Sequence, residues 1–351
     1  MKYMSCLNDQ LGMEFSPEEI AECKKENGLL SIELELSRIC NLRCLYCYAS
    51  SGDPLEDELS LDEIRNVVDQ ACDLGIRKVI VLGGGEPLLY PHLFEVLDHI
   101  RGKGLVMDLF TNGLCLTEEV AGELFKRSVG VVLKMNSRVP EIQDYLAGRK
   151  GAFQAISGGL QALESAGYPA EGCSLGIETV ICRQNYDELP DLWRWARSRN
   201  IVPYVEVMTM QGRAAEHLDL EVDSEQVRKM FETLSRIDSE EYGLNWVPHP
   251  PLVASQCARH EYSCTIASNG EVYPCPGVTV SGGNIRKEAL GAIIKNARVF
   301  KELRNIRETI KGRCADCDLS RECYGCRGHA YQITGDYLAE DPLCWLKKGA
   351  S

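Results

Sequence analysis

Three cysteines within eight residues constrain this chain more than any other feature. Cys40, Cys44 and Cys47 follow an apolar run at residues 29–36, with three and then two residues between them. Three thiolates at this spacing, on a loop that leaves a strand, can bind one iron-sulfur cluster and leave one of its irons without a protein ligand. An iron without a protein ligand is a place where chemistry can occur.

Other interpretations of the three cysteines are weaker. A structural zinc site needs a fourth ligand to complete its tetrahedron, and no further cysteine or histidine follows in the loop up to Leu59. A redox pair of the C-x-x-C type would not need Cys40. Ordinary buried thiols do not gather so closely. The iron-sulfur interpretation is therefore favoured.

A glycine-rich segment at residues 83–87 follows the next apolar run. Together with the cysteine loop, this segment resembles the radical S-adenosylmethionine (radical SAM) superfamily. The resemblance implies a [4Fe-4S] cluster held by Cys40, Cys44 and Cys47, with SAM bound to the fourth iron through its amino and carboxylate groups. It also implies reductive cleavage of SAM to methionine and a 5'-deoxyadenosyl radical, which abstracts hydrogen from a substrate carbon.

The resemblance further implies which side chains contact SAM. Tyr46, between the last two cysteines, would lie near the adenine. The segment that meets the methionine amino group would consist of Gly83, Gly84, Gly85 and Glu86. Asn136 is a candidate for a ribose hydroxyl, and Arg149 is a candidate for the SAM carboxylate, which a guanidinium can bind through two hydrogen bonds. A solvated surface role is the alternative for Asn136 and Arg149.

Short apolar runs alternate with amphipathic segments from residue 29 onward. The six runs that we interpret as strands are residues 29–36, 78–82, 105–110, 129–135, 175–181 and 201–208. Helix start signals lie between them, such as the capping box that begins at Ser60. Strands that alternate with helices predict a parallel sheet. We therefore expect an α/β fold with the partial (β/α)6 barrel that the resemblance also implies.

Candidate catalytic residues lie where the predicted strands end, because active sites of such barrels form at the carboxyl ends of the strands. Glu178 and Glu206 alternate with apolar neighbours and are expected to line the barrel lumen; the alternative is a buried carboxylate paired with an arginine. Cys115 follows the turn at residues 111–113. It is a candidate hydrogen-atom donor, with an ordinary core or surface thiol as the alternative.

Eight further cysteines follow a proline-rich boundary at residues 248–251. They are Cys257, Cys264, Cys275, Cys314, Cys317, Cys323, Cys326 and Cys344. Residues 264–275 have the pattern of a β-hairpin, with its turn at Asn269 and Gly270. Eight thiols divide into two sets of four, which fits two more [4Fe-4S] clusters or, equally well on spacing alone, two zinc sites.

These cysteines resemble the SPASM domain that follows many radical SAM cores. One auxiliary cluster would then be bound by Cys257, Cys264, Cys275 and Cys326. The other would be bound by Cys314, Cys317, Cys323 and Cys344. If all eight thiols are ligands, neither auxiliary cluster offers an iron to the substrate, and electron relay or oxidation of a substrate radical is the expected role.

Composition indicates the surroundings in which the protein works. A formal net charge of -14 disfavours a nucleic-acid groove. The chain begins without a signal-peptide pattern and contains no apolar stretch long enough to span a membrane. With 351 residues it does not need disulfides to stabilise its core, despite 17 cysteines. We expect a cytoplasmic protein without a membrane partner.

We expect four segments along the chain: an N-terminal extension (1–28), the barrel (29–222), a linker helix with the proline boundary (223–250) and the SPASM domain (251–351). The favoured function is hydrogen abstraction from a peptide or protein, leading to a crosslink, oxidation or epimerisation, as in peptide maturation. The alternatives are a small-molecule or cofactor-maturation enzyme acting on a tetrapyrrole, sugar or aminoglycoside, and a non-catalytic electron-transfer protein. Expected partners are a reductant such as flavodoxin or ferredoxin and a separate peptide-recognition protein.

Overall fold

The computed structural model describes residues 15–251, 257–321 and 323–346. Six parallel strands follow one another in chain order and curve into an open barrel, as predicted. They are β1 (Ser31–Glu35), β2 (Lys78–Leu82), β3 (Val106–Thr111), β4 (Val129–Lys134), β5 (Leu175–Ile181) and β6 (Val202–Val207). The bounds of β2 and β5 are those predicted, and the other four strands differ by one or two residues.

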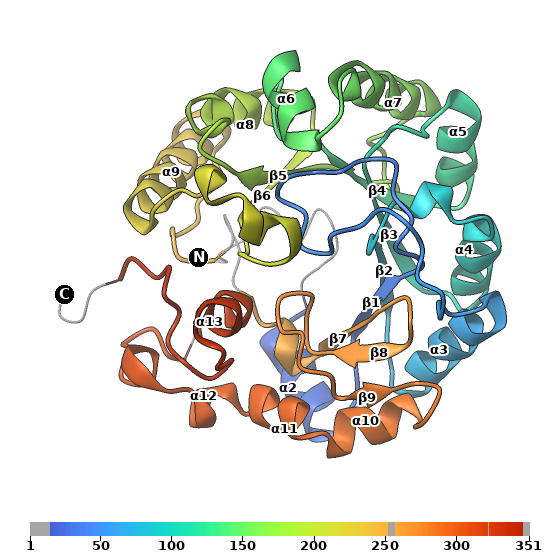
Figure 1. The fold of residues 1–351 in the computed structure, drawn as a ribbon, viewed down its shortest axis with the longest axis vertical. Helices are drawn as coiled ribbons and strands as arrows, with labels where there is room; N and C mark the ends of the chain where they lie inside the picture. Colours follow the sequence, from blue (N-terminus) through green and yellow to red (C-terminus); the bar gives the residue numbers. More distant parts are fainter. Residues whose placement is uncertain (1–14, 252–256, 322, 347–351) are drawn as a thin grey trace.

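Helices surround the barrel on its outer side (Figure 1). They are α3 (Leu61–Asp73), α4 (Leu93–Gly102), α5 (Glu118–Lys126), α6 (Pro140–Ala147), α7 (Ala152–Ala166), α8 (Leu189–Ser198) and α9 (Ser224–Ile237). The predicted capping box of α3 is present, with the Ser60 hydroxyl accepting a hydrogen bond from the Glu63 amide. Short α6 was not predicted; it begins with a proline at its first position, where a missing amide proton costs nothing.

The C-terminal segment extends the barrel sheet, which was not predicted. The hairpin of β7 (Ser263–Ile266) and β8 (Glu271–Tyr273) forms as expected, with Gly270 at a positive φ of 85° in the turn. However, β7 also pairs in parallel with β1, and β9 (Gly283–Asn284) pairs with β8. The result is one nine-stranded sheet in the order β6-β5-β4-β3-β2-β1-β7-β8-β9.

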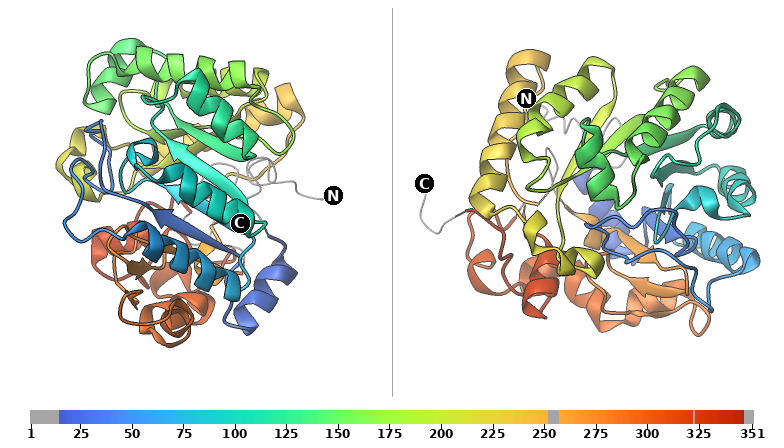
Figure 2. Two further views of the ribbon diagram at one scale, coloured as in Figure 1. Left: turned by 90° about the vertical axis from the view of Figure 1, so that its right-hand side faces the viewer. Right: turned by 45° about the horizontal axis from the view of Figure 1, so that its top comes forward.

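Short helices complete the C-terminal segment. They are α10 (Leu290–Asn296), α11 (Arg298–Arg304), α12 (Ile306–Thr309) and α13 (Arg327–Thr334). Near the other end of the chain, α2 (Pro17–Lys25) lies beside α11 (Figure 1). In the two further views the orange and red C-terminal elements lie beside the amino-terminal strands of the barrel (Figure 2).

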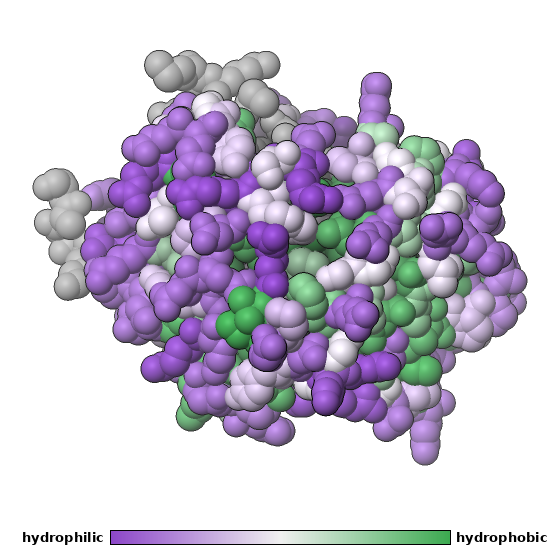
Figure 3. Space-filling view, turned by 90° about the horizontal axis from the view of Figure 1, so that it is seen from above, coloured by the Kyte–Doolittle hydropathy of each residue, from purple (hydrophilic) through white to green (hydrophobic). Residues whose placement is uncertain are grey.

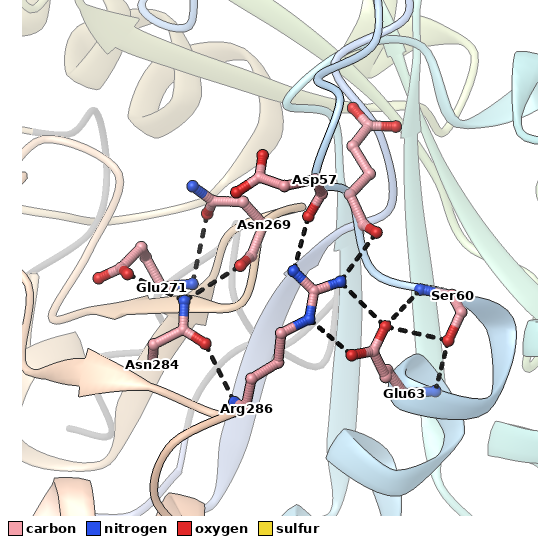
Figure 4. A network of polar contacts seen from close by, with 8 residues as sticks. Asp57, Ser60, Glu63, Asn269, Glu271, Asn284 and Arg286 are labelled. Carbon is pink, nitrogen blue, oxygen red and sulfur yellow. Dashed lines mark hydrogen bonds and ion pairs between the residues drawn. The ribbon is translucent and has the colours of Figure 1, made fainter.

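Arg286 joins the C-terminal segment to the beginning of α3 (Figure 4). Its guanidinium pairs with the Glu63 carboxylate at 2.6 Å and 3.0 Å, and it donates to the carbonyl oxygens of Asp57 and Glu58. These hydrogen bonds lower the pKa of Glu63 to about 2. The contact holds the loop after β9 against the barrel.

The two faces of β1 differ in character although all five of its residues are buried. Ile32 and Leu34 belong to the apolar core between the sheet and the outer helices. Glu33 and Glu35 alternate with them, and Glu33 lines a cavity on the lumen side. On the outer surface hydrophilic residues predominate over the face drawn in Figure 3. Along β1, the sheet thus separates apolar side chains of the outer layer from the two glutamates on the other face.

Candidate active site

A cavity of about 290 Å³ lies in the barrel, at the carboxyl ends of the strands. Its wall is made by the barrel and by the C-terminal segment together. Six cysteines line it: Cys40, Cys44, Cys47, Cys257, Cys275 and Cys326. The structure therefore brings the predicted first cluster site and part of the predicted auxiliary site to one cavity.

The cysteine loop after β1 is held in shape by its backbone and by one arginine. The Cys40 amide donates to the Gly52 carbonyl at 2.8 Å. From the end of β6, Arg213 donates to the carbonyl oxygens of Cys44 and Ser51, each at 3.0 Å. Burial raises the pKa of Cys44 to about 12, so a thiolate there needs the positive charge of a bound metal. This environment fits an iron-sulfur cluster.

The glycine-rich segment packs directly against the cysteine loop. A side chain on Gly85 would place its Cβ 2.0 Å from the Ile39 carbonyl oxygen. The Glu86 amide donates to the same oxygen at 2.7 Å. Gly83, Gly85 and Glu86 line the cavity, whereas Gly84 does not; a Cβ on Gly84 would lie 2.7 Å from a Glu35 carboxylate oxygen.

Glu86 also joins the loops after β2 and β3. Its carboxylate accepts hydrogen bonds from the Thr111 hydroxyl at 2.6 Å and the Asn112 amide at 2.7 Å. Burial raises its pKa. These bonds fix the position of the segment that the family resemblance assigns to the methionine part of SAM.

Charged side chains of three neighbouring strands meet in the cavity wall. Lys134 on β4 pairs with Glu178 on β5, with 2.7 Å between Nζ and Oε1. Its Nζ also lies 4.8 Å from the centre of the Tyr46 ring. On β6, burial and then the negative charge of Glu178 raise the pKa of Glu206. Glu178, Glu206 and Tyr46 thus line the cavity, as predicted from their positions.

Several charged residues of the cavity wall were missed by the sequence interpretation. Among them are Lys134, Glu33 and Arg259. Glu33 pairs with the Arg259 guanidinium and accepts a hydrogen bond from the Thr265 hydroxyl at 2.5 Å. The position of Glu33 between the apolar residues Ile32 and Leu34 could have predicted that its side chain faces the lumen. Arg259 precedes a strand that the sequence interpretation did not place beside β1, so no local signal was present.

The structure places three predicted site residues outside the cavity wall. Asn136 is fully buried and its side-chain oxygen accepts from the Val180 amide at 2.8 Å, which links β4 to β5. Arg149 donates to the Asn41 carbonyl at 3.0 Å. Cys115 accepts a hydrogen bond from the Asn41 side-chain amide. The cavity geometry gives no support to a SAM contact of Asn136 or Arg149, nor to hydrogen donation by Cys115.

Three cysteines of the C-terminal segment gather at the far side of the cavity. The negative charges of Cys326 and Cys257 contribute, after burial, to the raised pKa of Cys275. Cys326 caps α13 and accepts a hydrogen bond from the His329 amide at 3.4 Å. Burial opposes ionisation of Cys326, but the charge and hydrogen bonds of His329 lower its pKa overall. A thiolate at a helix amino terminus fits a cluster ligand.

The structure does not bring Cys264 together with these three cysteines. Cys264 lies on β7 opposite Ile32, in the core layer between the sheet and the outer helices. Its neighbour Thr265 points to the lumen instead, because successive side chains of a strand face opposite sides. Counting cysteines could not reveal this, since the count carries no information on the face.

The second predicted set lies elsewhere in the C-terminal segment. After burial, the charges of Cys344 and Cys314 contribute to the raised pKa of Cys323, and the charge of Cys314 contributes to the raised pKa of Cys344. Cys317 follows Cys314 in the same turn region. The grouping of these four thiols as ligands of one cluster stays a prediction.

Comparison with known proteins agrees with the fold and the cysteines. Residues 34–196 match the model of the radical SAM superfamily, and residues 257–318 match the SPASM model, described as an iron-sulfur cluster-binding domain. An AdoMet-dependent heme synthase from Methanosarcina barkeri is 31% identical and covers 91% of this chain and 97% of its own length. A PqqA peptide cyclase from Rhizobium meliloti is 27% identical, with 88% and 85% covered.

A solved structure shares the fold. SuiB from Streptococcus suis, bound to S-adenosylmethionine, has a TM-score of 0.71 and 18% identity, covering 94% of this chain and 81% of that chain. SuiB has also been solved bound to the precursor peptide SuiA. At this identity the likeness concerns the fold alone.

An open barrel with a three-cysteine loop after its first strand defines enzymes that bind SAM on a [4Fe-4S] cluster. The chain belongs to the radical SAM superfamily and carries a C-terminal SPASM domain. It is an enzyme with a SAM-binding [4Fe-4S] cluster and auxiliary clusters, which decides against the zinc and non-catalytic alternatives. None of the described helices is long and apolar enough to cross a membrane.

Proposed function

We propose that this radical SAM enzyme modifies a carbon atom of a peptide or protein, by crosslinking, oxidation or epimerisation. The size of the cavity carries the proposal. At about 290 Å³, it lies just below the roughly 300–1,000 Å³ of small-molecule sites, and SAM with the cluster at Cys40, Cys44 and Cys47 would occupy part of it. One side chain inserted from an extended substrate fits this space better than a whole macrocycle.

The residue roles form part of the proposal. Cys40, Cys44 and Cys47 hold the cluster that supplies reductive cleavage of SAM. Tyr46 lies beside the adenine, and the segment at residues 83–86 meets the methionine group. The barrel (29–222) and the C-terminal unit (251–351) supply the two walls that position the substrate and exclude water.

The partners proposed are a cytoplasmic reductant of the flavodoxin or ferredoxin type and a separate peptide-recognition protein. The similarity to a PqqA peptide cyclase supports a peptide substrate.

A second candidate function is decarboxylation or dehydrogenation of a tetrapyrrole. The 31% identity to an AdoMet-dependent heme synthase over 97% of its length favours it. Arg259 and Lys134 in the cavity wall provide cations for a carboxylate-bearing substrate, although each is paired with a glutamate.

Deuterium transfer distinguishes the two candidates. The reconstituted enzyme is supplied with SAM, reductant and either peptides from a fully deuterated protein digest or an iron porphyrin with four propionate groups. We expect deuterium in 5'-deoxyadenosine from the peptides. Loss of carbon dioxide from the porphyrin, without deuterium transfer from peptides, would establish the second candidate instead.

Matched cysteine variants control this experiment. Cys44→Ala removes a proposed cluster ligand and should abolish formation of 5'-deoxyadenosine. Cys72→Ala changes a thiol on α3, away from the cavity wall, and should leave it unchanged.

A further inference from the structure

We infer that the auxiliary cluster beside the cavity is bound by three cysteines only, Cys257, Cys275 and Cys326, and that one of its irons faces the cavity without a protein thiolate. This inference rests on the iron-sulfur assignment of the family and not on the substrate proposed above. It replaces the expectation that four cysteines bind this cluster and close it to ligands.

The face of β7 excludes Cys264 from the cluster. Ser263 and Thr265, on either side of Cys264, bond to Ser31 at 3.1 Å and to Glu33 at 2.5 Å, on the lumen side of β1. Cys264 is 1% exposed on the opposite side, in the apolar core. Turning Cys264 toward the lumen would require a one-residue shift of the β7 register. That shift would move all side chains of the strand to the opposite face.

A close backbone contact brings together two of the three remaining thiols, those of Cys275 and Cys326. A Cβ on Gly277 would lie 2.8 Å from the Gly328 Cα, and a Cβ on Gly328 would lie 3.0 Å from the Gly277 Cα. The loop after Cys275 therefore touches the first turn of α13, which Cys326 caps. Gln332 on α13 strengthens this contact by donating to the Gly277 carbonyl at 2.9 Å. Only glycine at both positions allows this approach.

The cavity wall beside the three thiols contains nitrogen donors rather than a fourth cysteine. His329 lines the cavity and is 2% exposed. Its Nδ1 has no hydrogen-bond partner in the described part of the chain and lies 3.7 Å from an Asp341 oxygen. Cys40, Cys44 and Cys47 lie in the wall of the same cavity. A substrate held there has access to the open iron through a carboxylate, thiolate or amine group.

Iron content tests the ligand set without any substrate. In a Cys40→Ala, Cys44→Ala, Cys47→Ala background only the auxiliary clusters form, with about eight irons per chain. Adding Cys264→Ala should leave about eight irons, whereas adding Cys275→Ala should leave about four. Loss of about four irons with Cys264→Ala would overturn the inference.

Folding controls keep this comparison meaningful. Cys23→Ala changes another buried thiol that lies near Arg304, as Cys264 does, and should behave like Cys264→Ala. If Cys264→Ala has a lowered melting temperature, Cys264→Val is used instead, because valine restores the buried volume. The iron content of Cys264→Val then decides whether Cys264 is a ligand.

A small ligand tests the open iron. In the same triple-alanine background, cyanide should change the electron paramagnetic resonance spectrum of the reduced auxiliary clusters. An unchanged spectrum contradicts an open iron. A change that appears only after adding His329→Ala also contradicts it, because His329 would then be the fourth ligand.

Discussion

Glu206 lies in the cavity wall beside a second carboxylate, Glu178. Because burial and this neighbour raise the pKa of Glu206 above its unfolded value of 4.5, the folded protein holds a proton that the unfolded chain releases. The stability from this proton is fully present below pH 4.5 and is lost as the pH rises toward the raised pKa of the folded state.

Glu206→Gln keeps the shape of the side chain and removes this titration. Relative to the original chain, we expect the variant to gain at least about 1 kcal/mol of unfolding free energy as the pH rises above 4.5. Urea denaturation at a series of pH values measures it. Glu232→Gln on the exposed side of α9 is the control, and parallel curves for Glu206→Gln and the original chain would refute the expectation.

The cavity side chains differ in how well the sequence predicts them. Glu178 and Glu206 were predicted because each interrupts an apolar strand at a position that faces the lumen. Lys134 was missed because it ends a strand, where a charged residue also fits solvent. Cys264 was misplaced because its spacing to other cysteines fits a ligand while its strand face does not.

At the scale of elements, Asp238 fixes the end of α9 against α8. It is fully buried and accepts hydrogen bonds from the indoles of Trp193 and Trp246, at 2.7 Å and 2.9 Å. The Arg197 guanidinium binds the same carboxylate at 2.8 Å and 3.0 Å. Asp238 thus accepts hydrogen bonds from three side chains, two of them on α8 and one in the loop that follows α9.

Asp238→Ala should lower the free energy of unfolding by about 3–5 kcal/mol, because it leaves the buried Arg197 charge without a partner. Chemical denaturation measures the loss. Glu241→Gln removes the exposed partner of Arg194 and should leave the free energy of unfolding nearly unchanged. Similar losses for the two variants would show that burial of the Asp238 network contributes little.

Arg286 provides an element-scale test of how the C-terminal segment is attached. Because the hydrogen bonds from Arg286 and, after it, from Ser60 lower the pKa of Glu63 from 4.5 to about 2, their joint stability is present above pH 4.5 and is lost as the pH falls through about 2. Both side chains are one-third exposed, so Arg286→Ala should cost only about 1 kcal/mol at neutral pH.

Hydrogen exchange gives the local readout of this contact. Amides of β9 and α10 should exchange faster in Arg286→Ala. Arg298→Ala breaks a pair within one helix and should leave these amides unchanged. Equal exchange in the two variants would mean that Arg286 does not hold the segment in place.

The elements themselves were largely predictable, whereas one of their pairings was not. Apolar runs bounded by helix start signals predicted six strands because both faces of each are buried. The hairpin followed from the turn at Asn269 and Gly270. The parallel pairing of β7 with β1 joins residues 232 positions apart, and local patterns contain no information on such a distant partner.

At the scale of the whole molecule, the C-terminal segment covers the edge of β1. A chain that ends after residue 250 would expose the unpaired amides and carbonyls of β1, and exposed strand edges promote association. We expect this truncated chain to aggregate. Its helical signal in circular dichroism should be weaker than that of a folded barrel of the same length. A monomer on size-exclusion chromatography, melting at the temperature of the full chain, would show that the barrel folds alone.

The pairing of β7 with β1 also sets an order of events during synthesis. Ribosomes add roughly 5–20 residues per second, so the 232 residues between the paired positions Ser31 and Ser263 take on the order of ten to fifty seconds to appear. Throughout that interval the edge of β1 in the nascent barrel has no partner strand. A newly made barrel is therefore open to association with other chains until the last quarter of the sequence has been synthesised.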